Sequence, residues 1–169
     1  VPDAPAPAGL VREHVPIPGK TQTDIALGRP TIRRSHPDYY ALNMADLILG
    51  GLGLMGRLGA NVRDRQGLAY YVYSDFDAAR GPAPWVVRAG VNPANIERAI
   101  QSILAEVQRI REQLVDEEEL ADGKSYLTGA LPLSLETNAG VARILQRIEL
   151  FNLGLDYLDR YPQIINALT

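Results

Sequence analysis

The sequence predicts a single α+β domain, in which an antiparallel β-sheet carries helices packed on one face. Three observations support this fold class. The pattern along the chain is one strand, two helices, a β-hairpin and then several helices, which is typical of α+β domains. The length of 169 residues suits one compact unit. Hydrophobic residues make up 46% and charged residues 22%, enough apolar side chain for a real core.

The chain begins with a segment that favours a linker. Residues 1–10 are rich in proline, starting with Val1-Pro2-Asp3-Ala4-Pro5-Ala6-Pro7, and residues 11–169 form the expected domain. Because the chain opens with Val instead of Met, we expect it to be a fragment of a longer protein. The first strand is predicted over residues 22–28, where Thr23, Ile25 and Leu27 alternate with more polar positions.

A helix is predicted to begin at Ser35-His36-Pro37-Asp38, which combines capping residues with a proline suited to a first turn. Its apolar positions suit a largely buried helix. Glycines at positions 50, 51 and 53 are expected to end it. A second short helix is expected over about residues 56–64.

A β-hairpin is predicted next. Residues 68–76 contain the aromatic and β-branched run Tyr70-Tyr71-Val72-Tyr73, and residues 85–91 form the partner strand across a turn at Gly81-Pro82.

The second half is predicted to be helical. Asn92-Pro93 is a good start for a helix. An apolar stripe follows at helical spacing, made of Ile96, Ile100, Ile103, Leu104, Val107, Ile110 and Leu114. Asp116 with Glu119 predicts a capping box, and the helix after it is expected to run towards Leu131 before Pro132 breaks it. Further helical segments are predicted over residues 141–151 and 157–168.

Composition argues against several classes of function. The net charge is -3 and basic residues form no dense run, so the pattern of a nucleic-acid-binding protein is missing. No apolar stretch reaches the roughly 20 residues of a membrane span, and the start lacks the features of a signal peptide. With no cysteine, no disulfide or thiolate metal site can form. We expect a soluble protein without nucleic-acid or membrane partners, in the cytoplasm or the periplasm.

A catalytic metal site is not expected within this chain. Its two histidines, His14 and His36, are too far apart to share a helix face, and no H-x-x-H or H-E-x-x-H spacing occurs. His36 is expected to serve at a helix start. The glycine-rich run over residues 50–59 lacks the Lys-Ser/Thr ending of a phosphate loop and follows a helix, which favours a turn between helices. Its glycines would also let a peptide backbone approach closely.

One segment carries a candidate for chemistry. Arg63 stands at a predicted helix end and Tyr70 at a strand start, with a glycine turn between them. Such a pair can donate hydrogen bonds to a peptide carbonyl, and a guanidinium that never loses its charge suits an oxygen that becomes negative during hydrolysis. An exposed arginine beside a packed strand tyrosine is the plainer interpretation of the same residues.

Four stretches of the chain are informative through their joint order and spacing. They are Gly19 to Gly28, His36-Pro37-Asp38-Tyr39-Tyr40-Ala41-Leu42, Gly50-Gly51 through Gly56-Arg57-Leu58, and Val62-Arg63 through Gly67-Leu68-Ala69-Tyr70. Together they resemble the C-terminal-type, non-zinc domain of the pitrilysin/insulinase family of zinc metallopeptidases. Each string is short, but later strings fall in the expected order, so the resemblance extends over nearly the whole chain. These later strings are Ala89-Gly90-Val91, Glu119-Leu120, Leu135-Glu136-Thr137 and Gly154-Leu155-Asp156-Tyr157. The resemblance also implies a closing helix and strand beyond Thr169.

The resemblance implies a division of labour. In this family two similar domain types close around a peptide, and the zinc ligands and general base lie on an H-x-x-E-H helix that this sequence lacks. Zinc is therefore expected on a partner domain of the same or another chain, with no cofactor here and no activity of this chain alone. Arg63 and Tyr70 match the spacing of the family's Arg and Tyr, implying that they bind the substrate's scissile carbonyl.

A glycine-rich substrate loop occupies the corresponding place in α subunits of mitochondrial processing peptidases, although the run here is much shorter. This correspondence with the family's substrate loop implies substrate-binding roles for Gly50, Gly51, Gly53, Gly56 and Arg57. Two alternatives remain open. The same fold serves as a non-catalytic structural core subunit in respiratory complexes, and an exposed sheet edge could make the domain a peptide-binding partner without zinc.

Overall fold

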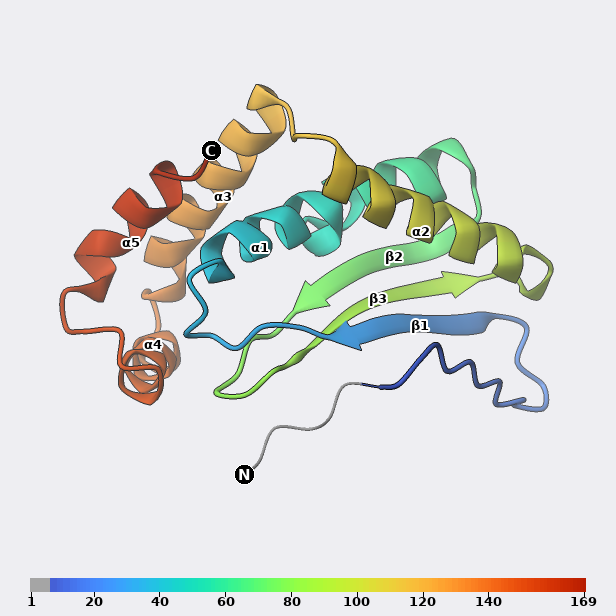
Figure 1. The fold of residues 1–169 in the computed structure, drawn as a ribbon, viewed down its shortest axis with the longest axis horizontal. Coiled ribbons are helices and arrows are strands. Elements are labelled where there is room, and N and C mark those ends of the chain that lie inside the picture. Colours follow the sequence, from blue (N-terminus) through green and yellow to red (C-terminus); the bar gives the residue numbers. More distant parts are fainter. Residues whose placement is uncertain (1–6) are drawn as a thin grey trace.

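The computed structural model describes residues 7–169 as a sheet with helices on one face (Figure 1). The strands are β1 (Thr23–Pro30), β2 (Ala69–Phe76) and β3 (Pro84–Val91). The α-helices are α1 (Tyr39–Asp46), α2 (Ile96–Glu112), α3 (Glu117–Ser134), α4 (Asn138–Leu150) and α5 (Tyr157–Asn166). Shorter 3-10 or π-helical segments are η1 (Leu47–Gly51), η2 (Gly53–Met55), η3 (Gly59–Arg65) and η4 (Pro93–Asn95). The predicted α+β class is confirmed.

The segment before β1 contains neither helix nor strand in its described part, residues 7–22, and most of it is exposed. Arg12 from this segment pairs with Glu97 on α2. The linker predicted for residues 1–10 falls largely on residues 1–6, which lie outside the described residues.

The sheet has the strand order β1-β3-β2, and both pairings are antiparallel. β2 and β3 form the predicted hairpin, while β1 reaches the far side of β3 from much earlier in the chain, with Thr23 opposite Val91 and Pro30 opposite Pro84. Side chains alternate between the two faces of each strand. Ile25, Val72 and Ala89 therefore point to the same buried layer.

α1 and α2 run along one face of this sheet, and α3, α4 and α5 gather beside α1 at one end (Figure 1). The main core lies between the sheet, η3 and α2, where Val62, Ala99 and Ile103 are completely buried. Removing a Val or Ile side chain from water contributes about 1.5–3 kcal/mol. This layer fixes η3 and β2 relative to each other.

The predicted apolar stripe of α2 needs a correction at two positions. Leu104 is 53% exposed and Leu114 is 97% exposed, so neither belongs to the core. Leu114 lies beyond the helix, which ends at Glu112. The position that completes the buried face instead is Glu106, which is only 4% exposed.

The glycine-rich run is a close-packed connection between α1 and β2. A Cβ atom added at Gly50 would lie 2.5 Å from the Ser74 backbone nitrogen, and one added at Gly56 would lie 3.0 Å from the Gly50 Cα atom. At Gly59 it would lie 2.5 Å from the Gly53 carbonyl oxygen. The absence of side chains lets η1, η2 and η3 fold back on one another over β2.

The end of α1 is anchored to the sheet by its last residue, Asp46, and by Trp85 on β3. The Trp85 indole Nε1 donates a 2.7 Å hydrogen bond to Asp46 Oδ1. Burial raises the pKa of the Asp46 carboxyl, against the opposing effect of this hydrogen bond.

The predicted helix start is confirmed. Asp38 stands immediately before the first helical residue, and His36 Nδ1 accepts a hydrogen bond from the Asp38 backbone at 3.1 Å.

The predicted caps at Asn92 and Asp116 are present, with Asn92 capping η4, which leads directly into α2, and Asp116 capping α3. Asn92 accepts a hydrogen bond from the Ala94 backbone at 2.9 Å, and Asp116 accepts one from the Glu119 backbone at 2.8 Å. The predicted break at Pro132 is wrong, because α3 continues to Ser134 with the proline inside it. Pro132 stands in the last turn, so the helix loses a single backbone donor there before it ends anyway.

Candidate functional site

Arg63 and Tyr70 flank one turn at the end of the sheet. Arg63 stands near the end of η3, and Tyr70 is the second residue of β2. Gly67 between them has a φ of +62°, a left-handed conformation that side chains disfavour. The turn therefore depends on the glycine that the sequence places there.

A β-bulge separates Tyr70 from the regular pairing of the sheet. Ala69 lies opposite Val91 and Tyr71 lies opposite Gly90, so Tyr70 is an extra residue without a partner on β3. Tyr70 and Tyr71 are consequently both exposed, at 65% and 37%. Bulges re-aim side chains and are frequent beside active sites.

Arg63 bonds directly to the bulge. Its Nε donates a 3.1 Å hydrogen bond to the Tyr70 carbonyl oxygen, and its Nη1 donates at 2.8 Å to Asp64 Oδ1. The Arg63 side chain is 39% exposed. Within residues 7–169, neither the Arg63 Nη2 nor the Tyr70 hydroxyl has a hydrogen-bond partner. Each residue of the pair thus keeps one donor available to a ligand.

The residues predicted in the glycine-rich run lie in different surroundings from Arg63 and Tyr70. Gly50 and Gly56 are buried, whereas Gly51 is exposed. Gly53 adopts a left-handed backbone conformation, with a φ of +62°. An open pocket of about 530 Å³ is lined by Gly51, Met55, Arg57, Arg65, Arg109, Glu119 and others. Gly51 and Arg57 therefore share a cavity that Arg63 and Tyr70 do not line.

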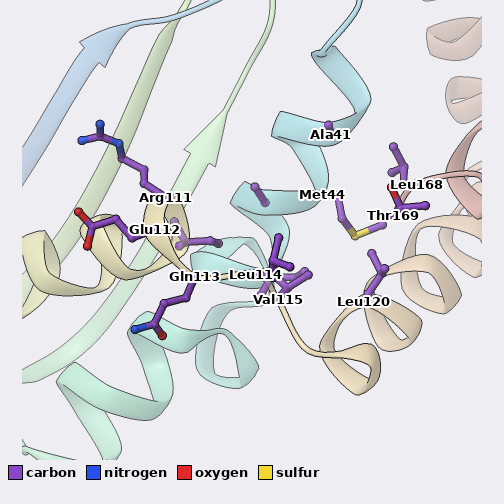
Figure 2. A pocket seen from close by; sticks show the side chains of 13 residues that line it. Ala41, Met44, Arg111, Glu112, Gln113, Leu114, Val115, Leu120, Leu168 and Thr169 are labelled. Carbon is purple, nitrogen blue, oxygen red and sulfur yellow. The ribbon is translucent and has the colours of Figure 1, made fainter.

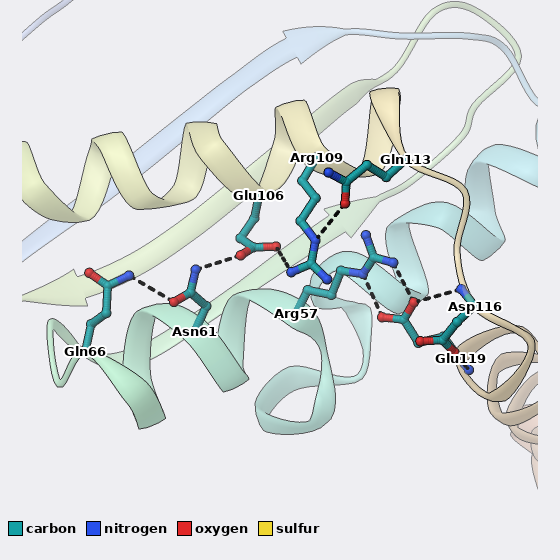
Figure 3. A network of polar contacts seen from close by, with 8 residues as sticks. All are labelled: Arg57, Asn61, Gln66, Glu106, Arg109, Gln113, Asp116 and Glu119. Atoms are coloured by element: carbon teal, nitrogen blue, oxygen red, sulfur yellow. Dashed lines mark hydrogen bonds and ion pairs between the residues drawn. The ribbon is translucent and has the colours of Figure 1, made fainter.

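Arg57 is held by a carboxylate beneath this pocket. Its Nε and Nη2 donate to the two oxygens of Glu119 at 2.6 and 2.5 Å, and the Arg57 side chain is 7% exposed (Figure 3). Hydrogen bonding from Arg57 lowers the pKa of the Glu119 carboxyl. Glu119 also accepts from the Asp116 backbone at 3.3 Å, so one side chain closes the capping box of α3 and anchors the glycine-rich run.

A second polar network connects η3 to α2, and the sequence interpretation missed it. Asn61 Nδ2 donates a 2.6 Å hydrogen bond to the buried Glu106, whose other oxygen faces Arg109 Nη1 at 3.5 Å (Figure 3). A signal was present in the sequence. Glu106 stands between Ile103 and Ile110 at helical spacing, where an apolar residue is expected.

Another pocket, of about 240 Å³, lies between α1, the α2–α3 connection and the end of the chain (Figure 2). Its interior is formed by apolar side chains such as Met44, Val115, Leu120 and Leu168. The charged ends of Arg111 and Glu112 point away from this group (Figure 2). The pocket has the chemistry of a packing gap between helices.

Donors for a metal are sparse in the part of the chain that the structure describes. No group of three His, Cys, Asp or Glu side chains gathers there that could hold an ion. His36 lies beside Asp38 at the start of α1, and His14 belongs to the exposed segment before β1. None of the helices over residues 7–169 is long and apolar enough to cross a membrane.

Comparison with known proteins gives consistent matches. Residues 1–127 match the family model described as the peptidase M16 inactive domain. An uncharacterized zinc protease of Mycobacterium tuberculosis is 35% identical over 132 residues, covering 76% of this chain and 29% of the relative. A probable inactive metalloprotease of Bacillus subtilis is 26% identical over 117 residues, covering 69% of this chain and 27% of that protein. The chain thus spans less than a third of the curated relatives it matches.

A crystal structure of a peptidase M16 inactive domain from Pseudomonas fluorescens superimposes with a TM-score of 0.81. The identity is 29%, and the match covers 89% of this chain and 36% of that one. Fold and sequence therefore agree.

Proposed function

The chain belongs to the peptidase M16 inactive-domain family, and from this premise we propose that it is the substrate-binding, non-zinc half of a zinc-dependent endopeptidase. In this proposal Arg63 and Tyr70 bind the scissile carbonyl of a peptide. The metal and the general base belong to an H-x-x-E-H domain of the same or another chain. The described residues of this chain offer no ligand cluster of their own for zinc.

The observation that carries the proposal is the hydrogen bond between the Arg63 side chain and the Tyr70 backbone. It keeps two exposed donor side chains at one turn. The Arg63 guanidinium remains charged at any physiological pH, and the Tyr70 hydroxyl is a neutral donor. Preorganised donors of this kind stabilise the negative charge that develops on a carbonyl oxygen when water attacks it.

The two residues divide the work by their chemistry. Arg63 Nη2 supplies a charged donor, while its Nε stays engaged with the chain itself. Tyr70 supplies an aromatic ring and a hydroxyl from a bulge, a position where a side chain can be aimed away from the sheet. Zinc on the partner domain would supply the activated water. Everything that this chain contributes is binding and orientation.

Within the glycine-rich run, the exposed part is the best placed for substrate. Gly51 and Gly53 border a tip that exposes Leu54 by 50% and Met55 by 83%. We propose that this tip contacts apolar side chains of the peptide. Gly50, Gly56 and Arg57 would support the tip from beneath, since all three are buried.

The first prediction tests the Arg63 and Tyr70 pair. In the protein assembled with its H-x-x-E-H domain, Arg63→Gln and Tyr70→Phe each lower kcat by about a hundredfold to a thousandfold, the usual effect of losing one oxyanion donor. The measurement is steady-state cleavage of a fluorogenic peptide, with circular dichroism and thermal unfolding to verify the fold.

Matched controls are available on the same domain. Arg98→Gln removes another exposed arginine, from α2, and Tyr73→Phe removes a hydroxyl three residues further along β2. Both controls keep the parent kcat. If Arg63→Gln and Tyr70→Phe also keep it, the proposed role of the pair is wrong.

A second candidate function is favoured by the relative from Bacillus subtilis described as a probable inactive metalloprotease. In that case the domain would be a structural or peptide-binding partner, using a free edge of the sheet at β1 or β2. The partner's sequence separates the two candidates. A partner domain without H-x-x-E-H, together with peptide binding that persists in chelator, would favour the non-catalytic role.

A further inference from the structure

We infer that a polar clamp from α2 holds η3 in place and thereby positions Arg63. The clamp consists of Asn61 and Gln66 on one side and Ser102 and Glu106 on the other. The inference rests on the proposed function of Arg63 and adds positioning residues that do not themselves touch the substrate.

η3 needs support from outside its own backbone. It is a π-helical segment, in which the Gln66 amide bonds to the Asn61 carbonyl five residues earlier at 3.1 Å. π-helical turns are rare and are frequently found at functional sites. Their widened hydrogen bonding is less favourable than an α-helix, so tertiary contacts must hold this register. Val62, itself a residue of η3, supplies one such contact because its side chain is fully buried in the main core.

The clamp adds polar contacts near both ends of the wide turn (Figure 3). Asn61 Nδ2 donates to Glu106 Oε1 at 2.6 Å, and Gln66 Nε2 donates to Asn61 Oδ1 at 2.9 Å. The Ser102 hydroxyl donates to Gln66 Oε1 at 3.2 Å. Ser102 and Glu106 are four residues apart on α2 and therefore lie on the same side of the helix. The two ends of η3 are thus joined to each other and to α2.

Glu106 makes the clamp resist rotation of η3. Its side chain is 5% exposed, so its charge must be met by specific partners. Asn61 and Arg109 meet one carboxylate oxygen each. A rotation of η3 would remove Asn61 and leave a buried carboxylate with one long contact. The clamp accordingly resists that rotation more strongly than apolar packing alone does.

Arg63 lies between the two clamped residues, Asn61 on η3 and Gln66 directly after it. Asn61 precedes it by two positions, and Gln66 follows it by three. Rotation of η3 would carry the Arg63 guanidinium away from the Tyr70 carbonyl, which it now reaches with a 3.1 Å hydrogen bond. Displacements of about 1 Å at a catalytic group can lower a rate by up to a hundredfold. The clamp therefore controls the geometry of the pair.

The test combines hydrogen exchange with kinetics on the protein assembled with its H-x-x-E-H domain. Asn61→Ala and Glu106→Leu are expected to accelerate amide exchange over residues 59–68 by about tenfold or more, because η3 opens locally. They also lower kcat by about ten- to a hundredfold. Glu106→Gln keeps one acceptor for Asn61, so its amide exchange over residues 59–68 and its kcat stay close to those of the parent protein. Glu112→Gln, the same change at an exposed site of α2, alters neither.

A double-mutant cycle isolates the positioning role. If the clamp acts through Arg63, Asn61→Ala lowers kcat in the parent protein but causes no further loss in the Arg63→Gln background. An additive loss in both backgrounds overturns the inference, as does unchanged exchange over residues 59–68. Gln66→Ala, at an exposed site, gives the same comparison if Asn61→Ala does not fold.

The two proposals fail separately. If Arg63→Gln leaves kcat unchanged, the proposed function is wrong at Arg63, and the exchange data alone then decide whether the clamp exists. If Arg63→Gln lowers kcat while Asn61→Ala accelerates exchange and leaves kcat unchanged, the clamp exists and does not position Arg63.

Discussion

Glu119 takes part in two structures at once. Its carboxylate accepts hydrogen bonds from Arg57 Nε, Arg57 Nη2 and the backbone amide of Asp116, and its own backbone amide donates to the Asp116 side chain. The sequence predicted the capping box, because the Asp and Glu spacing is local. The ion pair joins residues 62 positions apart, so no local pattern could reveal it.

A prediction follows for stability and pH. Glu119→Gln leaves Arg57 a buried cation without a counter-charge, and because the Glu119 side chain is 27% exposed we expect a modest loss of about 2 kcal/mol in the free energy of unfolding. The lowered pKa of Glu119 contributes stability that is fully present above about pH 4.5 and disappears as the pH falls through the lower folded-state value.

Urea unfolding between about pH 6 and pH 3 measures this effect. The difference between parent and Glu119→Gln is largest near neutral pH and shrinks in acid. Glu118→Gln, which removes an exposed carboxylate from the same helical turn, is the control and changes stability little. A difference that stays constant over the whole pH range would contradict the assignment.

Elements of regular structure were predictable where the signals are local. The hairpin, the helix start at Tyr39 and the caps at Asn92 and Asp116 all follow from neighbouring residues. The π-helical register of η3 depends on contacts with α2, and the bulge at Tyr70 lies in a run of tyrosines and valine that would suit a regular strand equally well. Such features are fixed by packing across the chain, which a single segment does not encode.

The sequence could pair Arg63 with Tyr70 through their spacing and the glycine turn, but it could not indicate the hydrogen bond that joins them. Nor could it show that Arg57 is buried. An arginine beside several glycines is ordinarily a surface residue, and here a carboxylate from a distant helix compensates its burial.

Two glycines give opposite predictions at the level of helices. At Gly59 on η3, an added Cβ would lie 2.6 Å from the Leu54 Cα atom as well as close to a backbone oxygen, so Gly59→Ala should lower the free energy of unfolding by about 1–3 kcal/mol. At Gly129 in α3, nothing lies within 4 Å, so Gly129→Ala should raise it by about 0.5–1 kcal/mol. Urea denaturation of both variants measures the contrast, and a shift of the same sign in both would contradict the packing described for η3.

At the scale of the whole molecule, Arg34 connects the sheet layer with the C-terminal helices. It is 4% exposed, its guanidinium lies 3.8 Å from the Tyr39 ring centre, and it donates to the Tyr40 and Tyr157 hydroxyls at 2.9 and 3.3 Å. Burial raises the pKa of Tyr161 in the same cluster to about 12. An aromatic cage thus replaces a carboxylate as the partner of this cation.

The proposed separation of substrate binding on this chain from the zinc site on an H-x-x-E-H domain makes a prediction for activity. We expect this chain alone to leave a fluorogenic peptide uncleaved, and the same chain joined to its H-x-x-E-H domain to cleave it. A metal chelator should abolish that cleavage. The H-x-x-E-H domain alone is the control and should be much slower. Cleavage by this chain alone, at a rate that survives repurification, would contradict the proposal.

The strand order carries a consequence for how the protein is made. Within residues 7–169, β1 pairs with β3 alone, and the partners of Thr23 and Pro30 are Val91 and Pro84, so the ribosome adds some fifty to seventy more residues before β1 can be paired. At a synthesis rate of about 5–20 residues per second, the nascent strand waits roughly 3–14 s. During that interval the apolar residues of β1 are accessible to chaperones. The sheet is completed by β3, which emerges long after the strand β1 that it must pair with.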